Sequence, residues 1–405
     1  MADTNSRYLK EVKTDWEEVQ ARIRKHRRKR RRRIILAAVC IAACLVILYI
    51  AMQVKTYGDY RVADSTERSD TQATNFLEME GDILKYSNDG AMYTTKKNEM
   101  IWNQTFEMEN PLVAVKGGYA AFADTDGQEV YVLDEDGLQV SFETGYPIRK
   151  IDISSQGVAA VLMADDSAGY LALYDDSGEC LAEGAIYMEN SGYPMDIALT
   201  DDGKNLAVTI LDVASGSVST TVTFYNFDSE GEDETDHIVS TYTYADCVIP
   251  QIVCPDGDSF LAFSDSGVIV YEGSQVPEES ERLSVTGEIK SVFYDDSYFG
   301  LVVSDEEEGG RVLIVYNLKC SEVMRFSLDV SYDEIYFLEN HEVCVQSAEH
   351  CEIYTVQGIK KFAADFEEEE LYYVMSKTGT RRYVFVLEGS SEQICLKLFS
   401  TLEEE

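Results

Sequence analysis

The sequence predicts an all-β fold: a single β-propeller of seven or eight four-stranded blades, with eight favoured. A cytoplasmic amphipathic helix and one transmembrane helix precede it. Three observations predict this arrangement. A strand motif returns at intervals of about 40–50 residues. Glycine-containing turns separate short runs rich in Val, Ile, Tyr and Phe. One uncharged apolar run lies near the N-terminus.

Residues 1–33 form a basic segment, with 13 Lys or Arg against 5 Asp or Glu. Its apolar side chains are spaced three and four apart, which predicts one apolar face of a helix. They are Leu9, Val12, Trp16, Val19 and Ile23. A segment of this length cannot form its own core. Two interpretations stay open: the helix lies on the inner leaflet of a membrane, or it binds a partner.

Residues 34–54, IILAAVCIAACLVILYIAMQV, contain no charged side chain. A helix needs about 20 apolar residues to cross a bilayer, whereas the apolar part of a cleaved signal peptide has about 7–15. No small-residue cleavage pattern follows, so we interpret the run as an uncleaved signal anchor. The cluster KHRRKRRRR at 25–33 places the N-terminus in the cytoplasm and the following chain outside the cell. A nucleic-acid patch is the less favoured interpretation of this cluster.

Residues 55–74 lack periodicity and aliphatic content, and we expect a polar stalk there. Residues 75–405 are then the extracytoplasmic propeller. The chain after residue 33 carries 69 acidic against 21 basic side chains. Such a surface repels nucleic acid and anionic lipid, and it attracts cationic partners.

The repeated strand motif decides between the all-β architectures. LALYDDSG at 171–178 aligns with similar stretches whose fourth residues are Leu133, Tyr174, Tyr225, Tyr271 and Tyr316, at steps of 41, 51, 46 and 45 residues. CEIYTVQG extends the series to Tyr354, and ILKYSNDG suggests an earlier member at Tyr86. Steps of about 40–50 residues with four strands each are typical of propeller blades.

A second recurrent stretch precedes each copy, and we interpret these stretches as the innermost strands. Examples are PLVAVKGG at 111–118 and IRKIDISSQG at 148–157. Seven blades start this way, and 75–107 adds an eighth. The last segment, 371–400, shows only three strands. We therefore expect an N-terminal strand to complete the last blade and close the ring.

Several stretches resemble one known family. They are LKYSNDG, WNQTFEMENP, SQGVAAVL, SGYPMDIALTDDGKNLAV, FYNF and VIPQIV. They are similar to domain-of-unknown-function family 5711, single-pass membrane proteins of clostridial Firmicutes. The resemblance implies a propeller-like extracytoplasmic domain and no particular activity, so no site residues carry over. The likeness to quinoprotein (PQQ-like) and WD40-like propellers extends to blade layout only, since Trp102 is the only tryptophan after residue 54.

The nine cysteines show neither a disulfide framework nor a zinc motif. If EVCVQS and HCEIYTV form a hairpin with a two-residue turn, Cys344 and Cys351 fall opposite each other, close enough to bridge. The alternative, that both are small buried apolar residues, is favoured.

No catalytic, cofactor-binding or metal-binding residues are predicted, and no cofactor. His237 lies in an acidic loop and is expected to be solvated, whereas His341 and His350 are expected at hairpin ends. Four aspartates, at 124, 126, 134 and 136, partly resemble calcium loops but lack ligands at the required spacing, so Asx turns explain them better. The acidic runs 305–308 and 367–370 are expected to be solvated loop tips.

These observations favour a non-catalytic binding or scaffold module, anchored in the cell membrane and exposed at the bacterial envelope, with a protein partner. One alternative is an envelope hydrolase or lyase with a site at the channel mouth. Another is a transmembrane sensor that signals through the N-terminal helix. Acidic or histidine side chains converging at one channel mouth would favour the enzyme.

Overall fold

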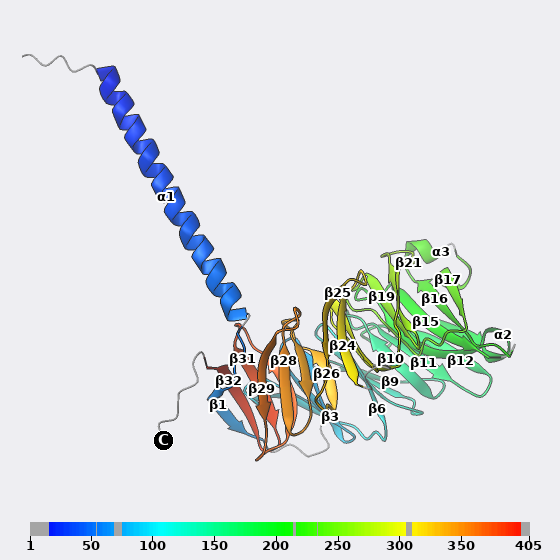
Figure 1. The fold of residues 1–405 in the computed structure, drawn as a ribbon. Coiled ribbons are helices and arrows are strands. Elements are labelled where there is room, and N and C mark those ends of the chain that lie inside the picture. The colour runs from blue at the N-terminus through cyan, green and yellow to red at the C-terminus, as the bar shows by residue number, and fades with distance from the viewer. Residues whose placement is uncertain are drawn as a thin grey trace, which may run out of the picture. The chain divides into compact units, whose positions relative to one another are not determined.

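A computed structural model describes residues 16–53, 55–68, 75–213, 216–232, 234–304 and 310–397. The chain divides into two compact units between Lys55 and Thr56. The first holds one long helix and the second holds the β-sheets (Figure 1).

The helix α1 (Trp16–Gln53) is continuous. It confirms the predicted helix in the N-terminal segment from Trp16 onwards, while Leu9 and Val12 lie outside the described residues. Across the ranges given above, no helix combines the length and the apolar character that a membrane span requires.

Eight four-stranded antiparallel sheets make up the second unit, and in seven of them the strands follow one another in space as in sequence. Blade 1 holds β2 (Asn75–Met79), β3 (Asp82–Ser87), β4 (Gly90–Thr94) and β5 (Met100–Thr105). Blade 2 holds β6 (Pro111–Lys116), β7 (Tyr119–Asp124), β8 (Glu129–Asp134) and β9 (Gly137–Glu143). Blade 3 holds β10 (Ile148–Ile153), β11 (Ala159–Ala164), β12 (Ala168–Tyr174) and β13 (Cys180–Tyr187). Blade 4 holds β14 (Tyr193–Leu199), β15 (Asn205–Asp212), β16 (Ser219–Asn226) and β17 (Ile238–Ala245).

The second half of the ring has the same construction. Blade 5 holds β18 (Gln251–Val253), β19 (Ser259–Ser264), β20 (Gly267–Glu272) and β21 (Glu278–Ser284). Blade 6 holds β22 (Ile289–Tyr294), β23 (Tyr298–Ser304), β24 (Arg311–Asn317) and β25 (Glu322–Ser327). Blade 7 holds β26 (Glu334–Phe337), β27 (Val343–Gln346), β28 (His350–Tyr354) and β29 (Lys360–Asp365). A short helix, α2 (Met188–Ser191), lies between blades 3 and 4. A second, α3 (Ser229–Glu232), and a 3₁₀ turn, η1 (Thr235–His237), lie between β16 and β17 of blade 4.

Blade 8 takes its fourth strand from the N-terminal end of the propeller unit. It holds β30 (Leu371–Ser376), β31 (Arg382–Leu387), β32 (Ser390–Leu396) and β1 (Tyr60–Glu67), which pairs antiparallel with β32 (Figure 1). Eight blades and the predicted closure by an N-terminal strand are therefore confirmed.

The polar stalk predicted for 55–74 is wrong where β1 lies. The sequence looked unstructured because most β1 side chains are exposed, so this outermost strand needs no apolar pattern. Backbone pairing with β32 holds it instead, and Tyr57 just before it is fully buried. The propeller therefore begins near residue 56 and not at 75.

The repeated motif marks a β-bulge. In blade 3 the register shifts between Leu173 and Tyr174, because Leu181 of β13 is an extra residue without a partner. The same shift directly precedes the third-strand residues Thr94, Leu133, Tyr174, Tyr225, Tyr271, Tyr316 and Tyr354. A bulge increases the local twist of a strand pair, and the sheets of propeller blades are twisted. Tyr86 was wrongly placed in this series, since it lies on the second strand of blade 1.

The core is divided into eight apolar clusters, one between each pair of neighbouring blades. The cluster between blades 4 and 5, for example, packs Phe224 against Phe260 and Tyr271 with ring centroids 5.2 and 4.9 Å apart. Each sheet is thus packed against a neighbouring sheet on both faces. Polar side chains of the first strands line the central channel instead.

Candidate functional site

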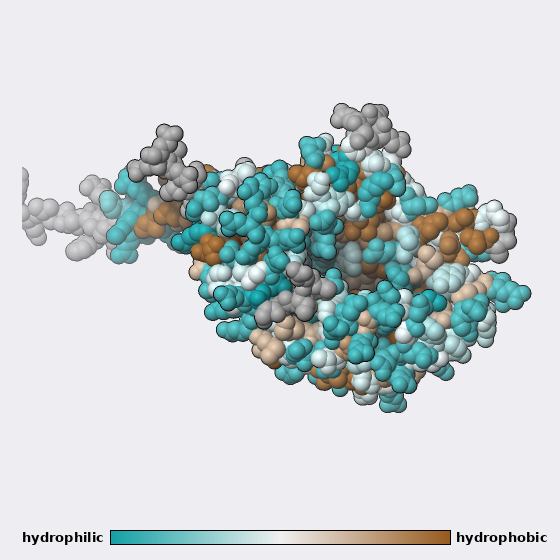
Figure 2. Space-filling model, turned by 90° about the horizontal axis from the view of Figure 1, so that it is seen from below, coloured by the Kyte–Doolittle hydropathy of each residue, from teal (hydrophilic) through white to brown (hydrophobic). Residues whose placement is uncertain are grey.

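The first strands of the blades surround a central cavity of about 950 Å³. Figure 2 shows the surface hollowed near its centre, with mostly hydrophilic side chains around the opening. Its lining combines six acidic and two basic side chains: Glu78, Asp152, Asp196, Asp201, Asp295, Asp296, Lys116 and Lys150. This cavity is the candidate site because it brings together charged groups from five different blades.

One pair of groups in the cavity holds the backbone of β14 in blade 4. The ammonium of Lys116 on β6 donates to the carbonyl oxygen of Leu199 at 2.6 Å. Asp152 on β10 accepts from the amide nitrogen of the same Leu199 at 2.7 Å, and its other oxygen accepts from Ile153 N at 2.8 Å. Burial raises the pKa of the Asp152 carboxyl. Blades 2, 3 and 4 are therefore tied together at the channel through the backbone of one residue, Leu199.

A second carboxylate repeats the arrangement one blade further on. Asp196 on β14 accepts from Ile252 N on β18 at 3.0 Å, and its other oxygen lies 3.2 Å from Lys150 Nζ. Burial raises the pKa of Asp196, while the Lys150 ammonium opposes that rise. Both oxygens of Asp152 and of Asp196 therefore have protein partners, which marks the two groups as parts of the scaffold.

Glu78 differs from these two carboxylates. Its Oε1 lies 3.6 Å from Lys96 Nζ and accepts no hydrogen bond. Lys96 is also 3.6 Å from Glu339 of blade 7, and it donates to the Ser376 carbonyl of blade 8 at 3.2 Å. Burial raises the pKa of Glu78 to about 7, with Lys96 lowering it and the Glu339 carboxylate raising it further. A carboxyl group that titrates near neutral pH can donate or accept a proton.

The hairpins of blades 6 and 7 bring a histidine next to Asp295 and Asp296, which line the cavity; we call these three residues the rim. His341 Nδ1 lies 2.8 Å from Asp295 Oδ2 and 3.7 Å from Asp296 Oδ1. The other Asp295 oxygen accepts from the amides of Ser297 and Tyr298 at 2.8 and 2.7 Å. Among the described residues, this is the one group of three or more metal-ligating side chains close enough to share an ion. It offers one nitrogen and two oxygens, but the other oxygen of Asp295 already accepts hydrogen bonds from the backbone of its own turn.

The sequence singled out the histidines, and the structure separates them. His341 lies in the β26–β27 turn and His350 begins β28, which confirms both as hairpin-end residues. His237 was expected to be solvated, but it is half-buried, with its ring centroid 5.5 Å from that of Phe227. The partner of His341 was missed because Asp295 is 46 residues away in sequence.

The calcium-like aspartates take backbone hydrogen bonds. Asp134 Oδ1 accepts from the amides of Asp136 and Gly137 at 2.7 and 3.2 Å, which confirms an Asx turn there. Asp124 instead accepts from the amides of residues 109 and 110, in the connection between blades 1 and 2, so the Asx turn predicted for it is wrong. Asp126 pairs with Arg149 at 2.5 Å. The acidic run 305–308 lies outside the described residues.

Lys116, Lys150, Asp152 and Asp196 are the charged cavity residues whose contacts the sequence did not predict. A signal was present for Lys116 and Asp196, because each is the one charged side chain of an inner strand that is mostly apolar. Which charges meet could not be predicted, since the contacts join different blades.

Solved structures with the same architecture are similar to the chain at low identity. BamB from Moraxella catarrhalis matches with a TM-score of 0.50 at 12% identity, over 85% of this chain and 99% of that one. Sqt1 from Saccharomyces cerevisiae gives 0.51 at 12%, over 84% and 99%. The C-terminal WD40 domain of Sif2 gives 0.54 at 11%, over 85% and 100%. At these identities the likeness concerns the fold alone.

In sequence, no curated protein matches the chain. One family model does, over residues 53–396: the family of unknown function DUF5711. The match covers most of the chain, including β1 and all eight blades. The chain therefore belongs to the DUF5711 family.

Proposed function

We propose that this DUF5711 protein is a membrane-anchored β-propeller that acts as a non-catalytic binding or scaffold module for a protein partner at the bacterial cell envelope. The carrying observation is that both oxygens of Asp152 and of Asp196 bind neighbouring protein groups. The charges at the centre of the channel hold blades together, which leaves the rim and the loops for recognition.

The anchor in this proposal rests on the sequence. Residues 34–54 are uncharged and follow directly on the basic cluster 25–33, and α1 runs through both. In a membrane this order keeps the N-terminus in the cytoplasm and the propeller outside. Membrane fractionation with protease treatment of intact cells tests it: the propeller should be digested from outside.

The rim chemistry favours a cationic partner surface. Asp201, Asp295 and Asp296 line the cavity, and among the described residues their basic contacts are Lys116 at 3.5 Å and the His341 ring. Acidic groups at a cavity mouth raise the local concentration of cations and speed their encounter. Binding should therefore weaken as salt concentration rises.

Site-specific photocrosslinking in native membranes tests the binding function. A photoreactive amino acid at position 296, on the rim, should yield a specific crosslinked product. The same group at position 183, on outer strand β13 and far from the cavity lining, is the matched control. Adding Asp295→Asn should reduce the product from 296. Equal products from 296 and 183, or none from 296, would contradict a binding function of the rim.

An envelope hydrolase or lyase is the second candidate function, and Glu78 favours it. This residue lines the cavity with a pKa of about 7, the range that suits a general acid or base. Glu78→Gln separates the two functions. If that variant loses the cellular role of the protein while crosslinking from 296 is unchanged, the enzyme is the better account.

Signalling through the N-terminal helix is an extension of the same proposal, favoured by the continuity of α1 from Trp16 to Gln53. A continuous helix can carry a displacement from one end to the other. Deleting residues 1–24 while keeping the basic cluster should then abolish the cellular role but leave crosslinking from 296 intact. Unchanged behaviour would remove the sensor.

A further inference from the structure

Cys344 and Cys351 lie on neighbouring strands of blade 7, β27 and β28. Ser347 and His350 exchange two backbone hydrogen bonds, of 2.8 and 3.4 Å, at the end of this hairpin. Counting back from that pair, Cys344 faces Ile353 and Cys351 faces Gln346, so the expected direct pairing of the cysteines is wrong by two residues. The turn is Ala348-Glu349, one residue further along than expected.

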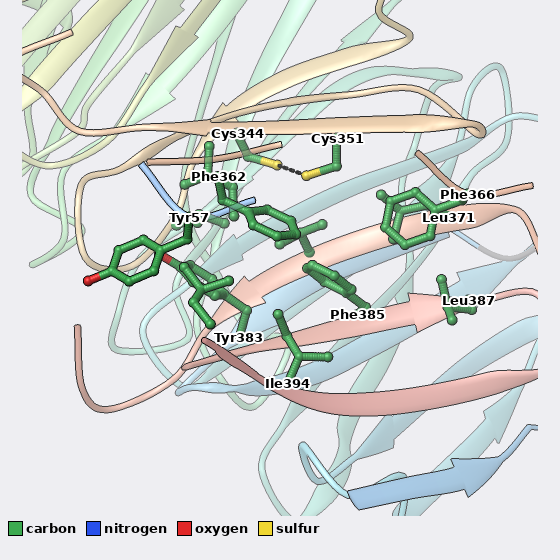
Figure 3. Packing of buried hydrophobic residues seen from close by; sticks show 14 residues of the cluster. Tyr57, Cys344, Cys351, Phe362, Phe366, Leu371, Tyr383, Phe385, Leu387 and Ile394 are labelled. Atoms are coloured by element: carbon green, nitrogen blue, oxygen red, sulfur yellow. Dashed lines mark hydrogen bonds between the residues drawn. The ribbon is translucent and has the colours of Figure 1, made fainter. Parts of the chain in front are cut away.

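The cysteines are nevertheless neighbours on one face of the hairpin. Both occupy non-hydrogen-bonded positions, where side chains of an antiparallel pair lie closer together. The twist of the sheet shortens the diagonal between such positions. The two sulfur atoms are 3.9 Å apart and face each other (Figure 3).

An apolar cluster encloses the pair completely. Both cysteines have 0% of their surface exposed, and the side chains around them include Tyr57, Phe362 and Phe385 (Figure 3). Among the described residues, the one group of three or more metal-ligating side chains lies elsewhere, at His341. Tyr57 comes from the segment that leads into the closing strand β1, which makes this the core of ring closure.

We propose that Cys344 and Cys351 are joined by a disulfide in the mature protein, formed when the β27–β28 hairpin is made and before the cluster around it closes. The inference rests on the extracytoplasmic location proposed above, where disulfides persist, and is independent of the proposed binding function. To form the bond, the sulfur atoms have to approach from 3.9 Å to about 2 Å.

The oxidant is an external disulfide, such as that of a thiol–disulfide oxidoreductase. One cysteine thiolate attacks it, forming a mixed disulfide and releasing one thiolate of the oxidant. The second cysteine thiolate attacks the protein sulfur of the mixed disulfide and releases the other. The two protons lost by the cysteines are taken up by the released thiolates, so two protein thiols and one disulfide become one protein disulfide and two thiols.

Timing follows from burial. In the folded protein no reagent reaches the sulfurs, and contact with Cys344 together with burial raises the pKa of Cys351, so the attacking thiolate is scarce. In the isolated hairpin both obstacles are absent, while seven residues of separation keep the sulfurs close. Once the cluster closes, the bond is protected from reduction.

Peptide mapping of the full-length chain decides the question. The protein is extracted from membranes under denaturing conditions with an alkylating reagent and no reductant, and then digested with trypsin. Residues 326–360 form one tryptic peptide that holds both cysteines. We expect it to carry no alkyl group and to be lighter than the dithiol peptide by two hydrogen atoms. Cleavage after Glu349 should then leave two fragments that separate only on reduction.

Cys247 and Cys254 are a matched internal control. They have the same separation in sequence and share the tryptic peptide 205–282, but one precedes β18 and the other follows it. Both should be alkylated. One or two alkyl groups on peptide 326–360 would overturn the proposal, as would equal protection of the control pair. In Cys344→Ala, Cys351 should become alkylated; should that variant fail to fold, the mapping of the natural chain still decides.

Discussion

Two halves of the ring are held together differently. Blades 2 to 6 follow one another along the chain, and their interfaces are apolar clusters with Asp152 and Asp196 holding backbone amides at the channel. The closing half, blades 7, 8 and 1, has apolar clusters too, but it also buries charged side chains. Of the five buried charged side chains in the described residues, Asp196 is in blade 4, and the others are in blades 1 and 7: Lys85, Glu342, Glu352 and Lys361.

The centre of the closing half is an ion pair. The ammonium of Lys361 and the hydroxyl of Tyr383, on blades 7 and 8, both contact the carboxylate of Glu342. Lys361 is also the bulged residue of β29, between two residues paired with β28. Its backbone carbonyl accepts from Tyr57 N at 2.7 Å. One residue thus connects the bulge, the ion pair and the segment before β1.

This difference teaches that connectivity decides which contacts are needed. Consecutive blades are brought together by short loops, and in blades 2 to 6 apolar packing is supplemented by hydrogen bonds to the backbone at the channel. β1 has to find β32 from more than 300 residues away, with few apolar side chains to guide it. The contacts of Glu342 join blades 7 and 8, and the carbonyl of its partner Lys361 holds Tyr57. We therefore infer that this group fixes the segment before β1, at some cost in stability.

Deleting residues 56–68 should have the largest effect on this comparison. It removes β1 and Tyr57, and burial of one large aromatic side chain is worth about 3–5 kcal/mol. That is a large part of the stability of a typical domain. We expect the closing half to lose its protection against limited proteolysis, with cuts concentrated in residues 334–396.

A deletion of equal length over residues 2–14 is the control, and it should leave the proteolysis pattern unchanged. Early cuts spread evenly over all blades would show that the ring unfolds as one unit. An intact pattern after deletion of 56–68 would show that β1 is dispensable for closure.

Lys361→Met should have the next largest effect. It leaves the Glu342 carboxylate buried without its cation, and breaking a buried ion pair typically costs about 3–5 kcal/mol. The free energy of unfolding in urea measures the loss. Adding Glu342→Leu should recover part of it, because the buried charge is then gone as well.

Lys204→Met is the control in the consecutive half, where the ammonium pairs with Asp228 at the surface, at 2.7 Å. Its loss should be much smaller, because water screens an exposed pair. Similar losses in the two variants would break the proposed distinction between the halves.

The sequence predicted the parts of this comparison that repeat. Leu133, Tyr174 and Tyr225 recur because these blades have a bulge in the fourth strand, opposite these third-strand residues. A structural requirement within one hairpin leaves a pattern in a short stretch of sequence. The closure was predictable by counting, since residues 371–396 supply only three strands. The strand that fills the gap was missed because an exposed outer strand can be polar throughout.

The candidate site was predictable only residue by residue. A lysine or an aspartate inside an apolar strand indicates a buried polar partner, as Lys116 and Asp152 show. That both bind the backbone of Leu199 follows from the arrangement of the blades in the ring, which no spacing in the sequence records. The same holds for Glu78, whose neighbours Lys96 and Glu339 come from blades 1 and 7.

Glu78→Gln should give the smallest effect, and one that depends on pH. The pKa of Glu78 is raised from 4.5 to about 7, so the folded state binds its proton more tightly than the unfolded state does. The stability that this provides is complete below pH 4.5 and is lost as pH rises to about 7, by at most about 3 kcal/mol. The glutamine variant keeps a neutral side chain at every pH. Its free energy of unfolding minus that of the natural chain should therefore rise between pH 4.5 and 7.

Glu322→Gln in blade 6 reverses the sign and so controls for the general effect of pH on an acidic protein. The Arg325 guanidinium lowers the pKa of Glu322, which means that its contribution is present above pH 4.5 and is lost as pH falls. The two difference curves should slope in opposite directions. A flat curve for Glu78→Gln would show that Lys96 keeps Glu78 ionised, and the closing half would then hold one more permanent ion pair instead of a group that titrates near neutral pH.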